Sequence, residues 1–349
     1  MTDSAQLNQT DLQCAQCGGQ CRFAPKLGAL LCQSCGTAHP VVDDLSFDPE
    51  TEISFDPDTP RLDVRKTPET AALQCGSCGG AVVFHGQSIS ENCPYCDGAL
   101  VRTVADESYD ALGMIPFAVD AVQAQTKALD WVARRWVAPS NLGEHVAGSR
   151  VAGIYVPFWT FDSVEAVDYT ILYRVNSGKS TSTRTQRGSM STKFDDMLVP
   201  ASGHVTPLIR DGILHDFDPE KLRPVNAGYL AGFAAERHHQ SVEEGLDLKA
   251  DDKALLLRNR IKRHSGKSNV VSIRYVTDTT DIRYRRILLP VWILHYTWGD
   301  TPKKVVVCGL HGRTFGERPF STIKLLGLAA LASLASALLG FLWGAFQIF

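Results

Sequence analysis

Four cysteine pairs with the spacing Cys-x2-Cys constrain what this chain can fold into more than any other feature. The flanking sequences LQCAQCGG and LQCGSCGG begin 61 residues apart, and in each copy 14 residues separate the two pairs. Such self-similarity at a fixed offset indicates two copies of one small structural unit. The eight cysteines are Cys14, Cys17, Cys32 and Cys35 in the first copy and Cys75, Cys78, Cys93 and Cys96 in the second.

This spacing is typical of zinc ribbons. Two thiolates separated by two residues reach one metal ion from a tight turn, and two such turns complete a tetrahedral site that is closed to solvent and therefore structural. A unit of about 25 residues has too small a core to fold without its metal. We therefore predict two structural Zn²⁺ ions, held by ribbons at residues 12–40 and 71–104.

A redox dithiol is an alternative interpretation of Cys75 and Cys78, because Cys-Gly-Ser-Cys resembles a thioredoxin motif. That motif needs a single pair at the end of a strand in a βαβ unit, whereas two matched pairs occur here in each copy. The remaining cysteines, Cys21 and Cys308, are expected to be partly buried free thiols.

Charge is distributed unevenly along the chain. Up to Asp97 there are 13 acidic and 5 basic residues, and from Gly98 onward 25 acidic and 30 basic. An acidic front part is unfavourable for nucleic-acid binding, which needs a basic surface, so we expect the ribbons to contact proteins. Nine acidic residues, three basic residues and several prolines lie in residues 41–70, which predicts an acidic flexible linker.

Residues 105–320 have the composition of a globular domain. Apolar residues recur at helical spacing between Val119 and Trp136, with further helical patterns at 226–246 and 251–264. Alternation from Val167 to Val175 predicts a half-buried strand that ends in a hairpin turn at Asn176-Ser177-Gly178. Strand pairs interrupted by one helical block indicate an α+β domain with a largely antiparallel sheet.

Two strand-like stretches, YVPFW at Tyr155 and LLPVW at Leu288, each contain a proline. Proline cannot donate a hydrogen bond to a neighbouring strand, so we expect both stretches at sheet edges or bulges.

No catalytic motif is found. The sequences Gly178-Lys179-Ser180 and Gly266-Lys267-Ser268 lack the earlier glycine of a phosphate-binding loop, and neither a GxSxG nor an HExxH motif occurs. His239 and Glu243 have i,i+4 spacing on a predicted helix, beside His238, but a pair without a third ligand is more often a surface contact than a metal site. A non-enzyme is therefore expected.

The densest basic run has two sharper interpretations besides a solvated helix face. Its side chains could contact anionic lipid headgroups or the phosphates of a nucleic acid, and a neighbouring membrane segment favours lipid. The candidate residues are Arg258, Arg260, Lys262 and Arg263.

The last 25 residues, 325–349, contain no charged side chain. A helix of that length spans about 37 Å, enough to cross a hydrocarbon core of about 30 Å. Basic residues precede the segment and none follows it, so the positive-inside rule predicts a single-pass, tail-anchored protein of the cell membrane with its bulk in the cytoplasm. The N-terminus has neither the basic nor the apolar region of a secretory signal.

Small residues four apart form a stripe on this helix that would let another helix approach closely, as in a homo-oligomer, although such stripes also arise by chance. They are Ala332, Ser336, Gly340 and Gly344.

With these parts assembled, the chain resembles a family of bacterial double zinc-ribbon membrane proteins, often labelled transcription-factor-IIB-type zinc-ribbon or primosomal protein N′-like (replication factor Y) proteins. The resemblance rests on the LQC-x2-CGG ribbons, YVPFW, LLPVW and the VCGLHGRTFGERPFS stretch before the tail. In that stretch Cys308 and His311 replace the usual Asn and Thr, whereas the framework of Gly309, Gly312, Gly316 and Pro319 is kept. The resemblance implies association with SPFH/flotillin-like and phage-shock-protein-A-like membrane-stress proteins.

Together these features predict a membrane-anchored, zinc-ribbon adaptor without catalytic activity that recruits cytoplasmic protein partners in a membrane-stress response. The alternative is a membrane-tethered nucleic-acid binder without helicase activity, because the chain lacks an ATP-binding loop. A third option is an enzyme whose site no motif reveals.

Overall fold

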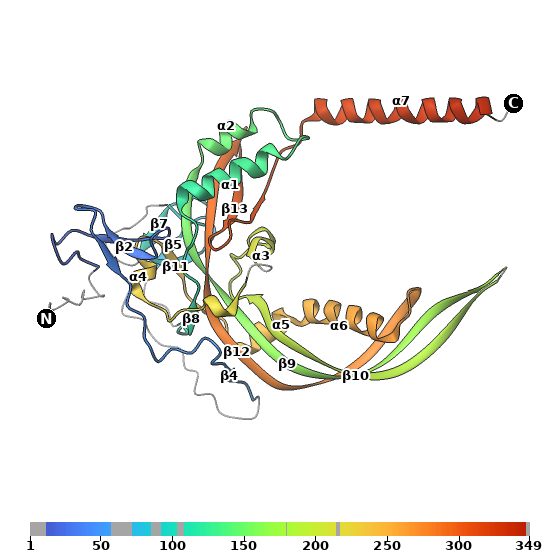
Figure 1. Cartoon of the computed structure of the whole chain (residues 1–349), viewed down its shortest axis with the longest axis horizontal. Helices are drawn as coiled ribbons and strands as arrows, with labels where there is room; N and C mark the ends of the chain where they lie inside the picture. The colour runs from blue at the N-terminus through green and yellow to red at the C-terminus, as the bar shows by residue number, and fades with distance from the viewer. Residues whose placement is uncertain are drawn as a thin grey trace.

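The computed structural model describes residues 12–56, 72–84, 92–102, 108–178, 180–213 and 217–346. In this part of the chain the fold is mixed α+β, as predicted, with a small sheet, a large sheet, several helices and the apolar helix α7 (Thr322–Phe346). Figure 1 shows the longest strands leaving the body as a curved arm, and α7 projecting separately from it.

Two very long strands form the centre of the large sheet. β9 (Arg150–Ser177) and β12 (Val270–Trp298) pair antiparallel along nearly their whole length. β10 (Ser180–Pro200) pairs with the other edge of β9 after a tight turn in which Gly178 has a φ of +58°. This left-handed conformation costs glycine little, and the predicted hairpin turn is confirmed.

Two β-bulges lie where the arm leaves the body. The register shifts between Phe194 and Met197 on β10 and between Thr280 and Arg283 on β12. Both bulges flank the same part of β9, and bulges bend the strands that carry them. One residue in each bulge has a positive φ: Asp196 (+48°) and Asp281 (+50°).

Helix α6 (Ala250–Ser265) covers one face of the arm. Its side chains Leu257 and Ile261 form a buried cluster with Val167 and Ile171 of β9. The alternation predicted for β9 and the helix predicted for 251–264 are therefore both confirmed, and each buries the apolar face that its pattern indicates.

Eight shorter strands extend the large sheet: β4 (Ile53–Ser54), β5 (Leu73–Cys75), β6 (Ala81–Phe84), β7 (Leu100–Arg102), β8 (Gly113–Met114), β11 (Ala234–Glu236), β13 (Thr301–Cys308) and β14 (Thr314–Gly316). The order along the sheet is β14-β13-β12-β9-β11-β6-β5-β7, with β10 on β9 and β4 and β8 on β12. Most pairs are antiparallel, but β11 is parallel to β9 and β8 is parallel to β12.

The two cysteine units are mounted differently on this scaffold. Strands β1 (Cys21–Ala24), β2 (Ala29–Cys32) and β3 (Ala38–Pro40) of the first unit form their own three-stranded sheet. Strands β5, β6 and β7 of the second unit belong to the large sheet, because β6 pairs with β11.

The remaining helices are short: α1 (Ala121–Ala133), α2 (Leu142–Ala147), α3 (Pro207–Ile213), the 3-10 helix η1 (Pro219–Lys221), α4 (Ala227–Leu230) and α5 (Val242–Leu248). The helix predicted between Val119 and Trp136 is confirmed as α1. The face that it buries, however, is not the one that carries its largest apolar side chains. Ala124, Ala128 and Val132 are buried, while Val122 and Trp136 are exposed.

The helix predicted for residues 226–246 is wrong. This stretch contains the single turn of α4, the buried strand β11 and only the first part of α5. Tertiary pairing overrides the helical propensity, since Ala234 and Ala235 lie between β6 and β9 in the large sheet.

The proline-containing stretches lie inside the sheet rather than at its edges, and each proline stands where the neighbouring strand changes. β9 and β12 pair with each other on their inner edges. On the outer edge of β9 the pairing strand changes from β11 to β10 at Pro157, and on the outer edge of β12 it changes from β13 to β8 at Pro290. Their carbonyls accept outward bonds from Ala201 (3.0 Å) and Gly309 (2.9 Å). The N–H that each proline lacks would point to this same outer side, where no strand ladder runs.

The acidic linker prediction fails for the residues up to 56, whereas 57–70 lie outside the described part. Asn226 donates to the carbonyl of Val42 (2.8 Å), and the Tyr229 hydroxyl donates to Asp43 (2.8 Å). Phe47 packs against a core cluster, and β4 pairs with β12. Residues 42–56, here called the strap, are therefore extended but attached to the domain at several points.

Candidate metal centres

The structure brings the four sulfur atoms of the first unit together. Cys14 and Cys17 lie on the turn before β1, Cys32 is the last residue of β2, and Cys35 lies on the turn that follows. The Sγ atoms of Cys14 and Cys35 are 3.7 Å apart, those of Cys17 and Cys32 are 3.5 Å apart, and all four lie within 4.8 Å of one another.

The second unit repeats this arrangement. The Sγ distances are 3.4 Å between Cys75 and Cys96 and 3.8 Å between Cys78 and Cys93, and its four sulfur atoms also lie within 4.8 Å of one another. The turns match in detail: Cys14 N donates to Gly19 O (2.7 Å), and Cys75 N donates to Gly80 O (2.9 Å). The predicted grouping of eight cysteines into two sets is thus confirmed.

Both sets fit a metal ion with tetrahedral thiolate ligands. Zinc–sulfur bonds of about 2.3 Å place tetrahedral sulfur atoms about 3.8 Å apart, close to the observed spacings. Main-chain N–H groups point at the sulfurs, with Ser34 on Cys32, Ser77 on Cys75 and Tyr95 on Cys93, each at 3.4 Å. These sets are therefore positioned to bind two metal ions, and soft sulfur ligands suit zinc.

The thiols differ in how readily they ionise. Hydrogen bonding by the side chain and backbone of Thr37 lowers the pKa of Cys35 to about 6. Burial opposes ionisation of Cys75, but the backbone N–H groups of Cys78 and Ser77 outweigh it and lower its pKa to about 7. Each set thus contains a thiol poised to become the thiolate that binds metal.

Two ligand-type residues beside the first set were missed by spacing alone. The Sγ of Cys21 and Nε2 of His39 lie within 4.8 Å of each other and of Cys14 Sγ, and His39 Nε2 is 3.2 Å from that sulfur. Cys21 is buried, as predicted, and burial raises its pKa to about 11. The comparison of the two repeat copies could have flagged both residues, since 61 residues further on stand Val82 and Leu100.

A buried polar network joins the second unit to the domain. The Tyr95 hydroxyl donates to Glu236 of β11, and Ser202 Oγ donates to the same carboxylate (2.8 Å). His204 Nδ1 lies 3.2 Å from Glu236 Oε1, and its Nε2 lies 3.0 Å from Cys78 O. The pKa of His204 is raised, mainly by this hydrogen bond with Glu236.

Two more side chains of the body hold the other metal-binding turn. Arg150 donates to Cys93 O (3.0 Å) and pairs with Asp97 (2.5 Å), while His295 Nε2 lies 2.9 Å from Pro94 O. The second cluster is therefore fixed by the domain at both of its turns.

The first unit contacts the body through its sheet. Phe23 N donates to Ala231 O (3.0 Å), and the Phe23 ring packs edge-on against Tyr229 with centroids 5.2 Å apart. At the surface, Lys26 pairs with Asp120 (2.7 Å).

The basic run divides into one structural and three exposed residues. Arg260 donates to Thr192 and to Lys193 O (2.6 Å) and lies over the Phe194 ring, so it attaches α6 to β10. Arg260 thus has a packing role in this structure, while its contact with lipid or phosphate stays a prediction. The other three, Arg258, Lys262 and Arg263, are exposed.

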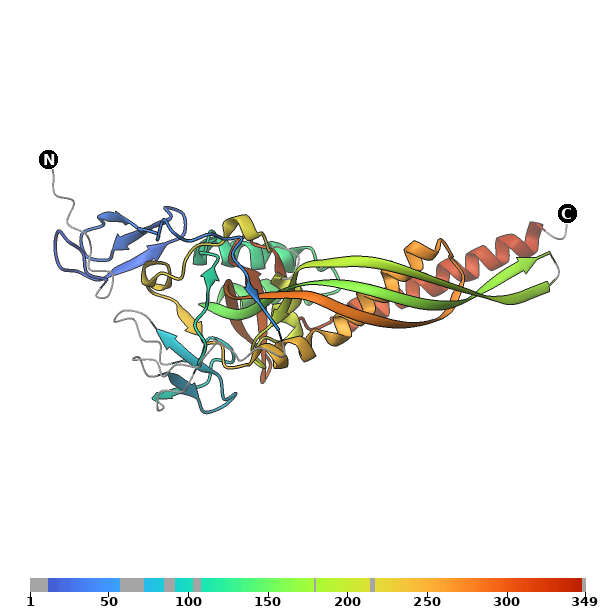
Figure 2. The same ribbon diagram turned by 90° about the horizontal axis from the view of Figure 1, so that it is seen from below.

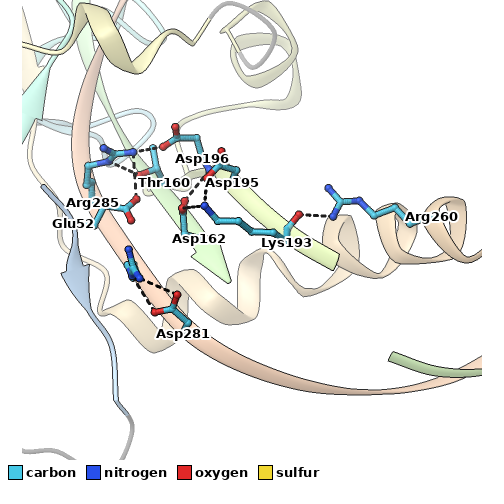
Figure 3. A network of polar contacts seen from close by, with 10 residues as sticks. Glu52, Thr160, Asp162, Lys193, Asp195, Asp196, Arg260, Asp281 and Arg285 are labelled. Carbon is cyan, nitrogen blue, oxygen red and sulfur yellow. Dashed lines mark hydrogen bonds and ion pairs between the residues drawn. The ribbon is translucent and has the colours of Figure 1, made fainter. Parts of the chain in front are cut away.

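An acidic group at the base of the arm also has ligand-type geometry: oxygens of Glu52, Asp162 and Asp196 lie within 4.8 Å of one another. Figure 3 shows Arg285 and Lys193 reaching into this group. Arg285 binds Asp196, Glu52 (3.3 Å) and Pro49 O (2.6 Å). Through these ion pairs the network fastens the strap to the bulged strands. Burial still raises the pKa of Glu52 to about 7.

The predicted histidine pair does not sit on a helix. His238 is fully buried with Nε2 3.1 Å from Phe158 O, and His239 lies before α5 begins, so the i,i+4 relation to Glu243 does not place the two side chains on one helical face.

Helix α7 is the one helix in the described part of the chain that is long and apolar enough to cross a membrane. The stretch Thr322–Gly340 meets this criterion and is not buried against the protein. Ala332, Ser336 and Gly340 of the small-residue stripe are exposed, and Gly344 lies in the same helix.

Comparison with known proteins finds a distant relative. The chain is 24% identical over 354 residues to uncharacterized protein YdjG of Bacillus subtilis (strain 168), an alignment covering 95% of this chain and 98% of the relative. No protein-family model and no solved structure matches. The relative's name assigns no activity.

Proposed function

We propose that this protein is a non-enzymatic, membrane-anchored adaptor whose zinc-loaded first ribbon recruits soluble proteins. The observation that carries the proposal is the placement of this ribbon. It forms a sheet of its own at the end of the molecule opposite α7 in both Figure 1 and Figure 2. A ribbon at the end of the molecule opposite the apolar helix would be accessible to a soluble protein partner.

Zinc would serve structure in both units. The four thiolates of each set would hold the ion and exclude solvent, which leaves no open position for catalysis. Cross-linking two turns through one ion stabilises a ribbon that has little apolar core of its own.

The membrane part of the proposal rests on α7. Lys303, Lys304, Arg313, Arg318 and Lys324 precede the apolar stretch, so the body would remain cytoplasmic. Lys324 Nζ donates to Ala138 O (2.8 Å), a contact that ties the start of the helix to the body. Self-association through the small-residue stripe is part of this proposal, and Leu substitution at Gly340 and Gly344 tests it by loss of cross-linked dimers.

Lipid contact would come from the outer face of α6. Leu255 and Leu256 are exposed there, two turns from Lys262 and Arg263, which combines apolar and basic groups as in interfacial helices. With α7 deleted, Lys262→Glu/Arg263→Glu should weaken binding to anionic vesicles at least about tenfold, since each basic residue contributes about 1 kcal/mol. Unchanged binding would remove lipid contact from the proposal.

The partners we propose are SPFH/flotillin-like or phage-shock-protein-A-like proteins of a membrane-stress response. The support for this choice is the family resemblance of the ribbon and YVPFW motifs.

The test is cross-linking and purification of the full chain from membranes after nuclease treatment. Cys32→Ser/Cys35→Ser removes ligands from the first ribbon, and Cys308→Ser is a matched control at a buried thiol outside both sets. Partners that resist nuclease should disappear with the double variant and remain with the control.

Recovered material that is nuclease-sensitive and indifferent to these cysteines would overturn the adaptor proposal. Nucleic-acid binding would then take its place, with a salt-dependent affinity for DNA.

A further inference from the structure

Ribbon 1 carries more metal ligands than one ion needs. We propose that it binds a second thiophilic divalent ion, such as Zn²⁺, through Cys21, His39 and a Cys14 thiolate shared with the first ion. The three ligand atoms lie within 4.8 Å of one another, a spacing that bonds of about 2.0–2.3 Å to one ion can span. The inference rests on the proposed zinc loading of the four-cysteine set.

The sheet register explains how these residues meet. Cys21 is opposite Cys32 in the β1–β2 pair, and His39 is opposite Leu30 in the β2–β3 pair. Residues opposite each other in antiparallel strands have side chains on the same face, and so do residues two apart in one strand. Cys21 and His39 are therefore on the face that carries the ligand Cys32.

The second ribbon supplies a natural control, because two backbone bridges of the first ribbon recur in it: Leu31 pairs with Ala38 as Asn92 pairs with Ala99. Gln13 pairs with Gln20 as Gln74 pairs with Ala81. At the positions of Cys21 and His39 it has Val82, which is fully buried, and Leu100. The ribbon fold thus needs neither a thiol nor an imidazole there.

A buried thiol and a ring nitrogen beside sulfur atoms are consequently better explained by a ligand role than by packing. Burying polar groups in place of hydrocarbon costs stability unless they find partners. Cys21 would lose its thiol proton to solvent on binding, and His39 would bind as the neutral imidazole through Nε2.

The second ion would differ chemically from the first. Two thiolates and one imidazole give three protein ligands, and His39 is only half-buried, so a fourth position would remain for water or an incoming ligand. An open position makes this ion exchangeable, whereas four thiolates enclose its neighbour.

The experiment counts metal in the intact chain. The full-length protein in detergent is saturated with Zn²⁺, weakly bound ion is removed with a weak chelator, and the zinc per chain is measured by native mass spectrometry. We expect three ions in the wild type. The variant Cys21→Val/His39→Leu, which installs the residues of the second ribbon, should hold two.

The outcomes separate this inference from the proposed function. Two ions in both proteins would overturn the inference and leave the zinc-loaded ribbons intact. Fewer than two in the wild type would contradict the zinc loading itself.

A second measurement tests the sharing of Cys14. After replacement of zinc by Cd²⁺, NMR of the bound cadmium nuclei should show two of three signals coupled to each other through one sulfur. Three uncoupled signals would mean that the second ion does not share Cys14.

Discussion

The two ribbons are copies of one unit, yet they have different relations to the rest of the molecule. Ribbon 2 is continuous with the large sheet through β6 and β11, and the body binds both of its metal-binding turns at Cys78 O and Cys93 O. Ribbon 1 keeps its own sheet and contacts the body through Phe23, Lys26 and other apolar side chains that it contributes to a core cluster shared with the body.

Because of this difference, the same kind of metal site has a different effect on stability in each ribbon. A cluster built into a sheet contributes to the stability of the whole domain, whereas a cluster in a peripheral sheet can be lost or altered without unfolding its support. Four predictions follow from this contrast, in order of decreasing effect.

The largest effect is expected from Cys93→Ser/Cys96→Ser. Metal binding supplies of order 10 kcal/mol to small zinc modules, and in ribbon 2 this free energy also holds the β5–β6 end of the large sheet. The melting temperature should fall by more than about 10 °C. Hydrogen exchange should accelerate in β6, β11 and the adjoining part of β9.

The matched variant Cys32→Ser/Cys35→Ser should accelerate exchange in ribbon 1 alone. If both double variants accelerate exchange in the large sheet equally, the two ribbons contribute equally to the stability of the domain and the contrast between them is wrong.

The next effect is expected from Phe23→Ala. Truncating this buried ring should destabilise the docking of ribbon 1 by about 3–4 kcal/mol, because it removes the packing against Tyr229. Limited proteolysis should cut within ribbon 1 while the body stays resistant. A loss of the whole domain would contradict the peripheral position of ribbon 1.

Glu236→Ala should cost about 2–3 kcal/mol in the free energy of unfolding. The substitution leaves the buried Tyr95 hydroxyl, Ser202 and His204 without their shared carboxylate. Denaturant unfolding measures this change, and the isosteric Glu236→Gln should recover part of it. An effect confined to ribbon 2, without loss of domain stability, would argue against the coupling through β11.

The smallest effect is expected from Lys26→Ala. The ion pair with Asp120 is at the surface, where such pairs contribute less than about 1 kcal/mol. The melting temperature should change by no more than a few degrees, and added salt should abolish the difference. A large, salt-independent change would mean that Lys26 has a packing role at this contact.

The sequence predicts the parts of this structure that depend on local spacing. The eight cysteines, the α6 helix and the hairpin turn at Gly178 are each determined by residues close together in the chain, and all are confirmed. The periodicity of α1 predicts a helix but not its inner face, because the small side chains of Ala124 and Ala128 pack into the core while the larger Val122 is exposed.

The errors involve partners that are distant in sequence. Val42 and Asp43 look like linker residues until Asn226 and Tyr229 supply their hydrogen bonds. In the same way, Cys21 and His39 reach the first cluster only through the register of three strands. Arg260 looks exposed in a basic helix, but β10 provides Thr192 and Phe194 beneath it.

The long central strand has a consequence for synthesis of the protein. β9 and β10 are neighbours in sequence and can form a hairpin early, but β12 ends only at Trp298. Until that residue leaves the ribosome, the other edge of β9 presents unpaired backbone groups that can join strands of other chains. Closing the central pair then requires contacts between residues far apart in sequence, which slows folding. The nascent chain is therefore the form of this protein most in need of a chaperone.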